Sequence, residues 1–170
     1  MGFEGQILKS LLYDKAQEII ARAQKINVTL ATAESCTGGM VSAILTEIPG
    51  ASAVFDRGFI TYSNQSKSQM LGVADETLAK YGAVSAQTAC EMAFGVLKNS
   101  KVDCAVSITG IAGPGGGTLE KPVGLVFFGY IKRGQPVKFL EKRFEASSRE
   151  IIRLEATKQA LDLLCLLLIN

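Results

Sequence analysis

The chain has 170 residues, of which 48% are apolar and 20% are charged, and this composition is typical of one globular domain that spans residues 1–170. A net charge of +2 without a basic run argues against nucleic acid as the main partner. The longest apolar run, residues 163–169, is too short to cross a bilayer, the N-terminus lacks a signal-peptide pattern and the four cysteines form no CxxC pair, so we expect a cytoplasmic protein with no membrane partner.

Helices and strands are predicted to alternate along the first half of the chain. The predicted elements are a helix over residues 7–25, a strand over 28–33, a helix from 40 to about 48, a strand over 53–62 and helices that follow positions 64 and 85. Local signals set several boundaries. Pro49-Gly50 ends the second helix, and Asn64 and Ser85 are the predicted N-caps of the next ones.

The second half is predicted to be richer in strands. Its elements are strands over residues 103–109, 123–131 and 137–144 and a final helix to about residue 169. Residues 132–136 join the last two strands as a hairpin, and Ser147 with Glu150 forms the capping-box pattern that precedes the final helix. Strands that alternate with helices, together with one hairpin, predict a three-layer α/β/α sandwich with a mixed, mostly parallel sheet.

The chain contains no histidine, and this absence limits its chemistry. Ser-His-Asp and Cys-His mechanisms are excluded, as is any metal site that uses His. Acid–base catalysis near neutral pH must then use Lys, Tyr, Cys or a carboxylate. The four widely spaced cysteines predict neither a zinc site nor a disulfide framework.

Two glycine-rich segments, residues 35–39 and 110–118, each follow a predicted buried strand. Because ligands bind at the carboxyl ends of strands in α/β sheets, both segments could border one crevice. The first leads into a helix whose N-terminal amides could serve as an oxyanion hole or phosphate cradle, or Ser35 or Thr37 could simply cap that helix. The second matches no phosphate-loop pattern, so it is either a plain surface loop or one that closes over a ligand.

Ser35, Cys36 and Thr37 are the candidate nucleophiles, and each would need a base. Lys67 falls in the first turn of its predicted helix, where the helix dipole disfavours positive charge. Burial or a neighbouring cation would lower the pKa of its amine further. A neutral lysine can accept a hydroxyl proton, as a Ser-Lys mechanism requires. The alternative is an exposed helix lysine. Tyr62 could orient the pair through its hydroxyl, or it could be a core residue with a solvated tip.

Arg149 and Arg153 lie one turn apart at the start of the final predicted helix. Together they could clamp a phosphate group in a bidentate fashion. They could equally pair with Glu150 and Glu155 on a solvated face. The sequence leaves both interpretations open.

Five segments resemble the motifs of the CinA C-terminal family, whose members are nicotinamide mononucleotide deamidases. In the expected order they are TAESCTGG at 32–39, RGFITYSNQSK at 57–67, GAVS at 82–85, SITGIAGP at 107–114 and EKPVG at 120–124. This resemblance covers nearly the whole chain. It implies a three-layer α/β/α fold and hydrolysis of nicotinamide mononucleotide to nicotinic acid mononucleotide and ammonia, within pyridine-nucleotide salvage. It also implies a serine nucleophile assisted by a lysine, without metal or cofactor.

The resemblance also implies roles for individual residues. It places the nucleophile at Ser35 and the lysine at Lys67, with Tyr62 lining the site. The residues expected to hold substrate are Thr37, Gly38 and Gly39 on one side, Thr109, Gly110 and Gly113 on the other, Cys36 beside the nucleophile, Arg149 toward the phosphate and Glu34 toward the charge of the pyridinium ring. The expected partner is therefore a small nucleotide.

Two other functions remain compatible with the sequence. One is a non-catalytic nucleotide-binding module with a regulatory role, which would bind the nucleotide without releasing ammonia. The other is a Ser-Lys amidase that acts on a different small amide. For assembly we expect a homo-oligomer, with a symmetric dimer as the simplest form, and the apolar residues 163–169 could pack in the core or form its contact.

Overall fold

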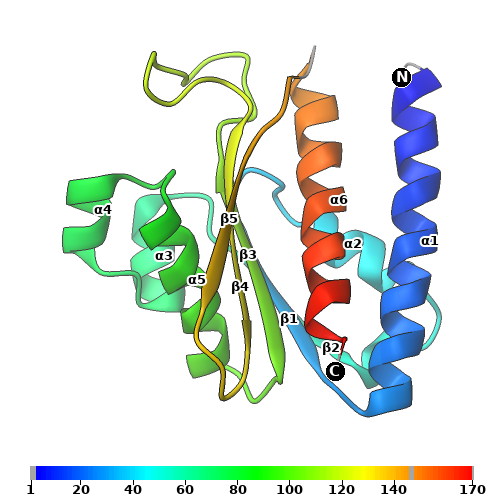
Figure 1. Cartoon of the computed structure of the whole chain (residues 1–170). Helices are drawn as coiled ribbons and strands as arrows, with labels where there is room; N and C mark the ends of the chain where they lie inside the picture. Colours follow the sequence, from blue (N-terminus) through cyan, green and yellow to red (C-terminus); the bar gives the residue numbers. More distant parts are fainter. Residues whose placement is uncertain (1–2, 146–147, 170) are drawn as a thin grey trace.

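The computed structural model describes residues 3–145 and 148–169, in which a five-stranded sheet lies between two layers of helices (Figure 1). The sheet has the order β2-β1-β3-β4-β5, with β1 (Leu30–Glu34), β2 (Phe55–Ile60), β3 (Cys104–Gly110), β4 (Leu125–Lys132) and β5 (Lys138–Arg143). Strand β1 pairs in parallel with β2 and β3, whereas β4 is antiparallel to both β3 and β5. Only β4 therefore opposes the other strands of the described sheet, and the predicted α/β/α sandwich with a mixed, mostly parallel sheet is confirmed.

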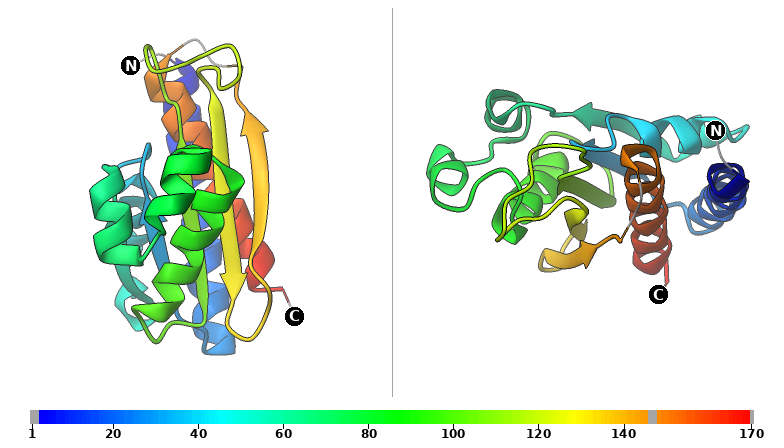
Figure 2. Two further views of the ribbon diagram at one scale, coloured as in Figure 1. Left: turned by 90° about the vertical axis from the view of Figure 1, so that its left-hand side faces the viewer. Right: turned by 90° about the horizontal axis from the view of Figure 1, so that it is seen from above.

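The helices divide between the two faces of the sheet (Figure 2). One layer holds α1 (Phe3–Ile26), α2 (Met40–Thr46) and α6 (Arg149–Leu167), and the other holds α3 (Asn64–Leu71), α4 (Asp75–Tyr81) and α5 (Ala86–Lys98), with a short 3-10 helix η1 (Ala51–Ala53) before β2. Successive side chains of β1 point to opposite faces of the sheet and pack into both cores. Leu30 packs into the α1–α2–α6 core, whereas Ala31 and Ala33 pack into the core beneath α5.

Most predicted elements are present, and the differences lie at their ends. The N-cap of α3 is Ser63 and not the predicted Asn64, because the Ser63 hydroxyl accepts from the Ser66 N–H and the Ser63 N–H donates in return to the Ser66 hydroxyl. Helix α6 is capped by Ser148, whereas the predicted cap, Ser147, lies outside the described residues. Helix α4 was not predicted, because it buries none of its seven residues and so has no apolar stripe.

The predicted apolar faces are largely buried, with informative exceptions. The stripe of α5 is fully confirmed by its buried residues Ala89, Met92, Ala93, Val96 and Leu97. On α1, however, Ile7 and Leu11 remain 46% and 47% exposed. At the end of α6 most of the leucines lie in the core, while Leu166 and Ile169 face outward. Within the described ranges, none of the helices combines the length and the apolar character needed to traverse a bilayer.

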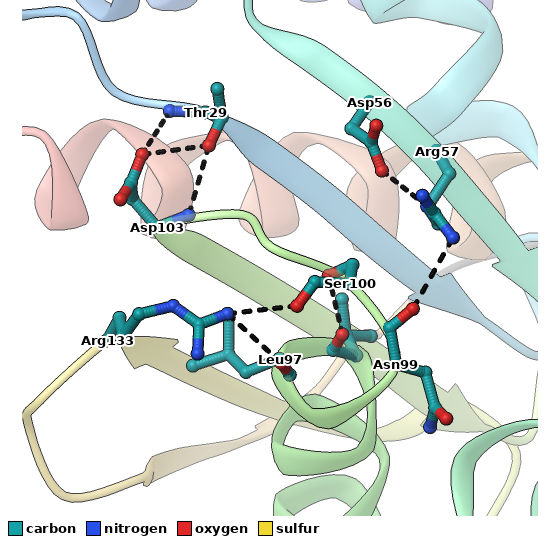
Figure 3. A network of polar contacts seen from close by, with 9 residues as sticks. Thr29, Asp56, Arg57, Leu97, Asn99, Ser100, Asp103 and Arg133 are labelled. Carbon is teal, nitrogen blue, oxygen red and sulfur yellow. Dashed lines mark hydrogen bonds and ion pairs between the residues drawn. The ribbon is translucent and has the colours of Figure 1, made fainter.

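A polar network ties the sheet together at the end where β1 and β3 begin (Figure 3). The Asp103 carboxylate accepts from both the N–H and the hydroxyl of Thr29, each at 2.8 Å. Arg133, in the β4–β5 turn, donates to the carbonyls of Leu97 and Ser100 at 3.0 Å each, which satisfies the C-terminal end of α5. These bonds fix the start of β1 against β3. They therefore help to fix the position of the turn 35–39, which follows the other end of β1.

Candidate active site

Three segments that carry candidate residues meet at the edge where β1, β2 and β3 end. Strand β1 continues into the turn 35–39, β2 into the segment before α3, and β3 into the glycine-rich loop 111–124 (Figure 1). Backbone bonds join them directly. The Ser35 N–H donates to the Ile108 carbonyl of β3, and the Thr61 N–H donates to the Glu34 carbonyl of β1, both at 2.9 Å. The two glycine-rich segments thus lie at one end of the sheet, where ligands bind in α/β folds.

A serine hydroxyl and a lysine amine meet at this edge. Ser35 Oγ lies 3.0 Å from Lys67 Nζ, and Nζ also donates to the carbonyl of Thr61 at 2.7 Å. Both side chains are shielded from solvent, with Ser35 9% exposed and Lys67 only 1% exposed. The structure thus brings together the two side chains that were predicted to react, and it rules out the alternative of an exposed helix lysine.

Lys67 is delivered by the first turn of α3. The Ser63 cap begins the helix, and the Lys67 N–H donates to the Ser63 carbonyl at 3.2 Å. Side chains on a helix lean toward its N-terminus, so the Lys67 amine reaches back toward the end of β2. There the Thr61 carbonyl holds Nζ beside Ser35.

The environment changes the protonation of this amine. Burial lowers the pKa of Lys67 from its ordinary 10.5 to about 8, an effect that the Cys36 thiol opposes. A shift of this size raises the neutral fraction of the amine at pH 7 by roughly 300-fold. Of the causes that the sequence suggests, the helix dipole, burial and a neighbouring cation, burial is the largest.

Glycines shape the turn that follows β1. Gly38 and Gly39 have φ angles of +62° and +98°, in the left-handed region that favours glycine. A Cβ on Gly39 would also lie 3.0 Å from the Ile60 Cδ1. The N–H of Gly38 donates to the Ser35 carbonyl, and the N–H of Gly39 donates to the Glu34 carboxylate. Both glycine amides are therefore engaged within the turn.

Arg153 holds the same turn from the other layer. It donates to the carbonyls of Cys36 and Thr37 at 3.1 and 2.7 Å. The predicted pairing with Glu150 or Glu155 is wrong, because the Arg153 guanidinium binds the turn and makes no ion pair with either carboxylate in the described ranges. In a trans peptide the N–H points opposite to the C=O, so the bond to the Cys36 carbonyl turns the Thr37 N–H away from α6. That N–H has no hydrogen-bond partner among residues 3–145 and 148–169.

The Glu34 carboxylate is committed to the turn and to α2. It is fully buried and accepts five hydrogen bonds, which come from the hydroxyl of Thr37, the N–H groups of Gly39 and Val41, and both the N–H and the hydroxyl of Ser42. These bonds satisfy the free amides at the start of α2 and place negative charge at its N-terminus. We therefore assign Glu34 to holding the turn, in place of the predicted contact with a pyridinium ring.

Of the three candidate nucleophiles, only Ser35 has a base beside it. The Thr37 hydroxyl is fully buried and donates to Glu34 at 2.7 Å. Burial raises the pKa of the Cys36 thiol to about 11, which disfavours the reactive thiolate. These contacts give Thr37 and Cys36 roles in the structure of the turn, and they leave Ser35 as the hydroxyl that faces an amine.

Tyr62 and Arg149 form the rim of the site and not its centre. The Tyr62 side chain is 61% exposed, and its hydroxyl accepts from Arg149 Nη2 at 3.0 Å. Arg149 Nη1 donates to the Gly113 carbonyl at 2.8 Å. Tyr62 therefore does not orient the Ser35–Lys67 pair through its hydroxyl as predicted, since the Thr61 carbonyl takes that position. Arg149 instead links the glycine-rich loop to the segment that precedes α3.

The remaining candidates belong to the end of β3. Thr109 is 1% exposed, and its hydroxyl donates to the Ala83 carbonyl at 2.7 Å. Gly110 is needed for packing, since a Cβ there would approach the Leu125 carbonyl to 2.8 Å. Sequence reasoning missed Thr61, because a backbone carbonyl has no residue-type signature. The Lys121 amine, beyond the glycine-rich loop, donates to the Tyr81 carbonyl at 2.6 Å and anchors the loop to α4.

The opposite end of the sheet carries a separate hollow. It has a volume of about 530 Å³, and its lining includes Arg57, Lys98 and Lys101. No predicted site residue lines it, and the Ser35–Lys67 pair lies at the other end of β1. No group of three or more Cys, Asp or Glu side chains able to hold a metal occurs in residues 3–145 and 148–169. The buried Ser35–Lys67 pair is therefore the candidate reactive site of the described residues.

The CinA C-terminal domain model matches residues 12–168. A nicotinamide-nucleotide amidohydrolase PncC of Shigella flexneri is 52% identical over 137 residues, which cover 80% of this chain and 82% of that protein. A putative competence-damage inducible protein of Acetivibrio thermocellus is 57% identical over 125 residues, 71% of this chain but only 30% of that longer protein.

Solved structures show the same fold. The competence/damage inducible protein CihA from Agrobacterium tumefaciens has a TM-score of 0.90 and 49% identity, covering 92% of this chain and 94% of that one. A CinA superfamily protein from Escherichia coli has a TM-score of 0.87 and 32% identity, covering 93% of this chain and 90% of that one. With the family model matched across nearly its whole length and the fold shared with these structures, the chain belongs to the CinA C-terminal domain family.

Proposed function

We propose that this protein hydrolyses the carboxamide of nicotinamide mononucleotide to nicotinic acid mononucleotide and ammonia, with Ser35 as the nucleophile and Lys67 as the general base. The observation that carries the proposal is the 3.0 Å separation of Ser35 Oγ and Lys67 Nζ in a buried setting that lowers the pKa of the amine to about 8. The similarity to a nicotinamide-nucleotide amidohydrolase over four fifths of the chain supports the substrate.

Acylation uses the neutral form of Lys67. The Ser35 hydroxyl donates its proton to Nζ while Oγ attacks the carboxamide carbon and forms a tetrahedral oxyanion. Protonated Lys67 then gives that proton to the departing nitrogen, the C–N bond breaks and ammonia leaves. The Thr61 carbonyl, 2.7 Å from Nζ, keeps the amine directed at Ser35 throughout. The product of this half-reaction is a nicotinoyl ester on Ser35.

The oxyanion needs a donor close to Ser35. The sequence predicts that amides at the turn after β1 fill this role, and those of Gly38 and Gly39 are already engaged within the turn. The Thr37 N–H has no partner in the described part of the chain, and Arg153 holds its peptide plane. We therefore assign the oxyanion contact to the Thr37 amide, with Arg153 as a positioning residue.

Deacylation repeats the same chemistry with water. Neutral Lys67 takes a proton from a water molecule as the water oxygen attacks the acyl carbon. The Ser35 Oγ–C bond breaks, Oγ recovers the proton from Lys67, and the carboxylic acid product leaves. Neither step requires a metal or a cofactor.

We assign the nucleotide to the space between the rim and the glycine-rich loop, next to Arg149. Arg149 is exposed at the rim and links Tyr62 to Gly113, so its guanidinium can meet a phosphate without moving far. Arg149→Gln should then raise KM for the nucleotide by about tenfold or more, with a smaller change in kcat. A decrease in kcat larger than the increase in KM would argue against Arg149 as the phosphate-binding residue.

Ammonia release from nicotinamide mononucleotide by the purified protein tests the proposal. Ser35→Ala should lower the rate by about 1,000-fold or more, and Lys67→Met by at least about 100-fold, while both remain folded by circular dichroism. Lys98→Ala, at the far end of the sheet, is the matched control. Full activity in Ser35→Ala would show that a group other than Ser35 is the nucleophile. A panel of amides with and without a phosphate separates this reading from an amidase of different substrate, and binding without ammonia release would indicate a non-catalytic module.

A further inference from the structure

Thr61 presents a buried hydroxyl without a partner. Its side chain is fully buried, and its Oγ1 is the sole buried side-chain oxygen or nitrogen without a hydrogen-bond partner across residues 3–145 and 148–169. The other fully or almost fully buried threonines all make side-chain hydrogen bonds, namely Thr32, Thr37, Thr88, Thr109 and Thr157. An unsatisfied buried hydroxyl costs roughly 1–3 kcal/mol, so its position calls for a specific cause.

That hydroxyl belongs to the residue whose carbonyl holds the amine of Lys67. The main chain of Thr61 is held on both sides, because its N–H donates to the Glu34 carbonyl at 2.9 Å and its carbonyl accepts from Nζ at 2.7 Å. Phe59, two residues earlier, packs against the core beneath α5, so by strand alternation the Thr61 side chain faces the same layer, from which α3 brings Lys67. A buried amine can make three hydrogen bonds, and Nζ makes two, to Ser35 and Thr61.

We propose that one ordered water molecule bridges Thr61 Oγ1 and Lys67 Nζ, which makes Thr61 a positioning residue for the catalytic amine. A single water satisfies both groups, since buried waters typically make about three bonds to polar atoms that would otherwise be unpaired. With two positions of Nζ fixed by the Thr61 carbonyl and this water, the lone pair of the neutral amine points at the Ser35 hydroxyl. The catalytic part of this inference rests on the proposed function, whereas the water and its effect on Lys67 do not.

The bridge also bears on the charge of Lys67. The titratable groups gathered at the turn are Glu34, Cys36 and Arg153, and among them the Cys36 thiol is the one that affects the pKa of Lys67. A water that accepts from Nζ stabilises the ammonium form more than the neutral form. Removal of the Thr61 hydroxyl should therefore lower the pKa of Lys67 further.

The test compares Thr61→Val, which keeps the shape of the side chain, with Thr61→Ser, which keeps the hydroxyl. Thr61→Val should lose about tenfold in kcat at similar KM and shift the pKa of Lys67, followed by NMR of the labelled amine, downward by about half a unit or more. Thr61→Ser should restore both. Thr157→Val is the control, since its fully buried hydroxyl bonds only within α6.

A Thr61→Val protein with unchanged kcat and unchanged Lys67 titration overturns the proposal, as does a high-resolution crystal structure of the wild type without a water between Oγ1 and Nζ. That crystal structure decides the matter even where Thr61→Val does not fold. The NMR titration and the water do not depend on any substrate. A protein that releases no ammonia would thus overturn the proposed function and still leave this inference open to test.

Discussion

The buried amine predicts a measurable cost in stability. Lys67 has a folded pKa of about 8 against an ordinary value of 10.5. Below pH 8 the folded protein must carry a buried ammonium, and between pH 8 and 10.5 the unfolded chain binds more protons, so the free energy of unfolding rises with pH across this window. At 1.36 kcal/mol for each pKa unit, the charge costs about 3 kcal/mol at pH 7.

Lys67→Met removes that cost and keeps the packing. The variant loses the two bonds of Nζ, worth about 1 kcal/mol each, so at pH 7 it should be more stable than the wild type by about 1 kcal/mol, although inactive. Urea unfolding at pH 7 and pH 10 measures the effect. The wild type should gain about 2–3 kcal/mol relative to Lys67→Met between these values, since other titrating groups cancel in the difference. Parallel stability curves for the two proteins would refute the argument that Lys67 is buried with a lowered pKa.

Three further predictions concern the site. The kcat/KM for ammonia release should rise with pH on its acidic side around a pKa of about 8, because Lys67 must be neutral to accept a proton, and a flat profile from pH 6 to 10 would exclude this base. Glu34→Gln should lower the free energy of unfolding by about 2–4 kcal/mol in urea, because an amide NH₂ would face N–H donors where the carboxylate accepts five bonds, and an unchanged midpoint would contradict this role. Cys36→Ala should keep at least about a third of the activity. The wild-type Cys36 thiol should react slowly with alkylating reagents at pH 8, because burial raises its pKa to about 11. Fast labelling of the thiol together with inactivity of the variant would identify Cys36 as the nucleophile.

The fold was predictable because its signals are local and periodic. The apolar stripe of α5, the alternation of strands with helices and the hairpin between β4 and β5 all follow from spacing that the sequence displays. Helix α4 was not predicted because polar contacts hold its start, as when the Ala74 N–H donates to Glu91 of α5, and it packs against the core through the half-buried Leu78 without an apolar stripe. The boundary at Ser63 was missed by one residue, since Ser63 and Asn64 are equally good caps by type.

The site was predictable in its residue types and less so in their tasks. The absence of histidine directed attention to Lys67, and the turn after β1 directed it to Ser35, and these two side chains do meet. The sequence does not indicate which polar groups are already satisfied. Glu34 and Arg153 have the chemistry of ligand contacts, yet both bind the main chain or side chains of the turn. The bonds of Arg153 join positions 117 and 116 residues apart, and those of Glu34 depend on how the turn folds back onto the start of α2, so neither set follows from residue type.

Strand alternation at the end of β1 has a consequence for how the protein can tolerate insertions. Glu34 points to the layer of α2 and Ser35 toward Lys67 on α3, so neighbouring positions serve opposite sides of the sheet. One extra residue within β1 would exchange the two, with a carboxylate set against the lysine and a hydroxyl left to satisfy the start of α2. A single insertion would therefore remove both the Ser35–Lys67 pair and the hydrogen bonds of Glu34 to the start of α2. Length changes in the 114–120 segment of the loop after β3, between the anchors at Gly113 and Lys121, carry no comparable double penalty.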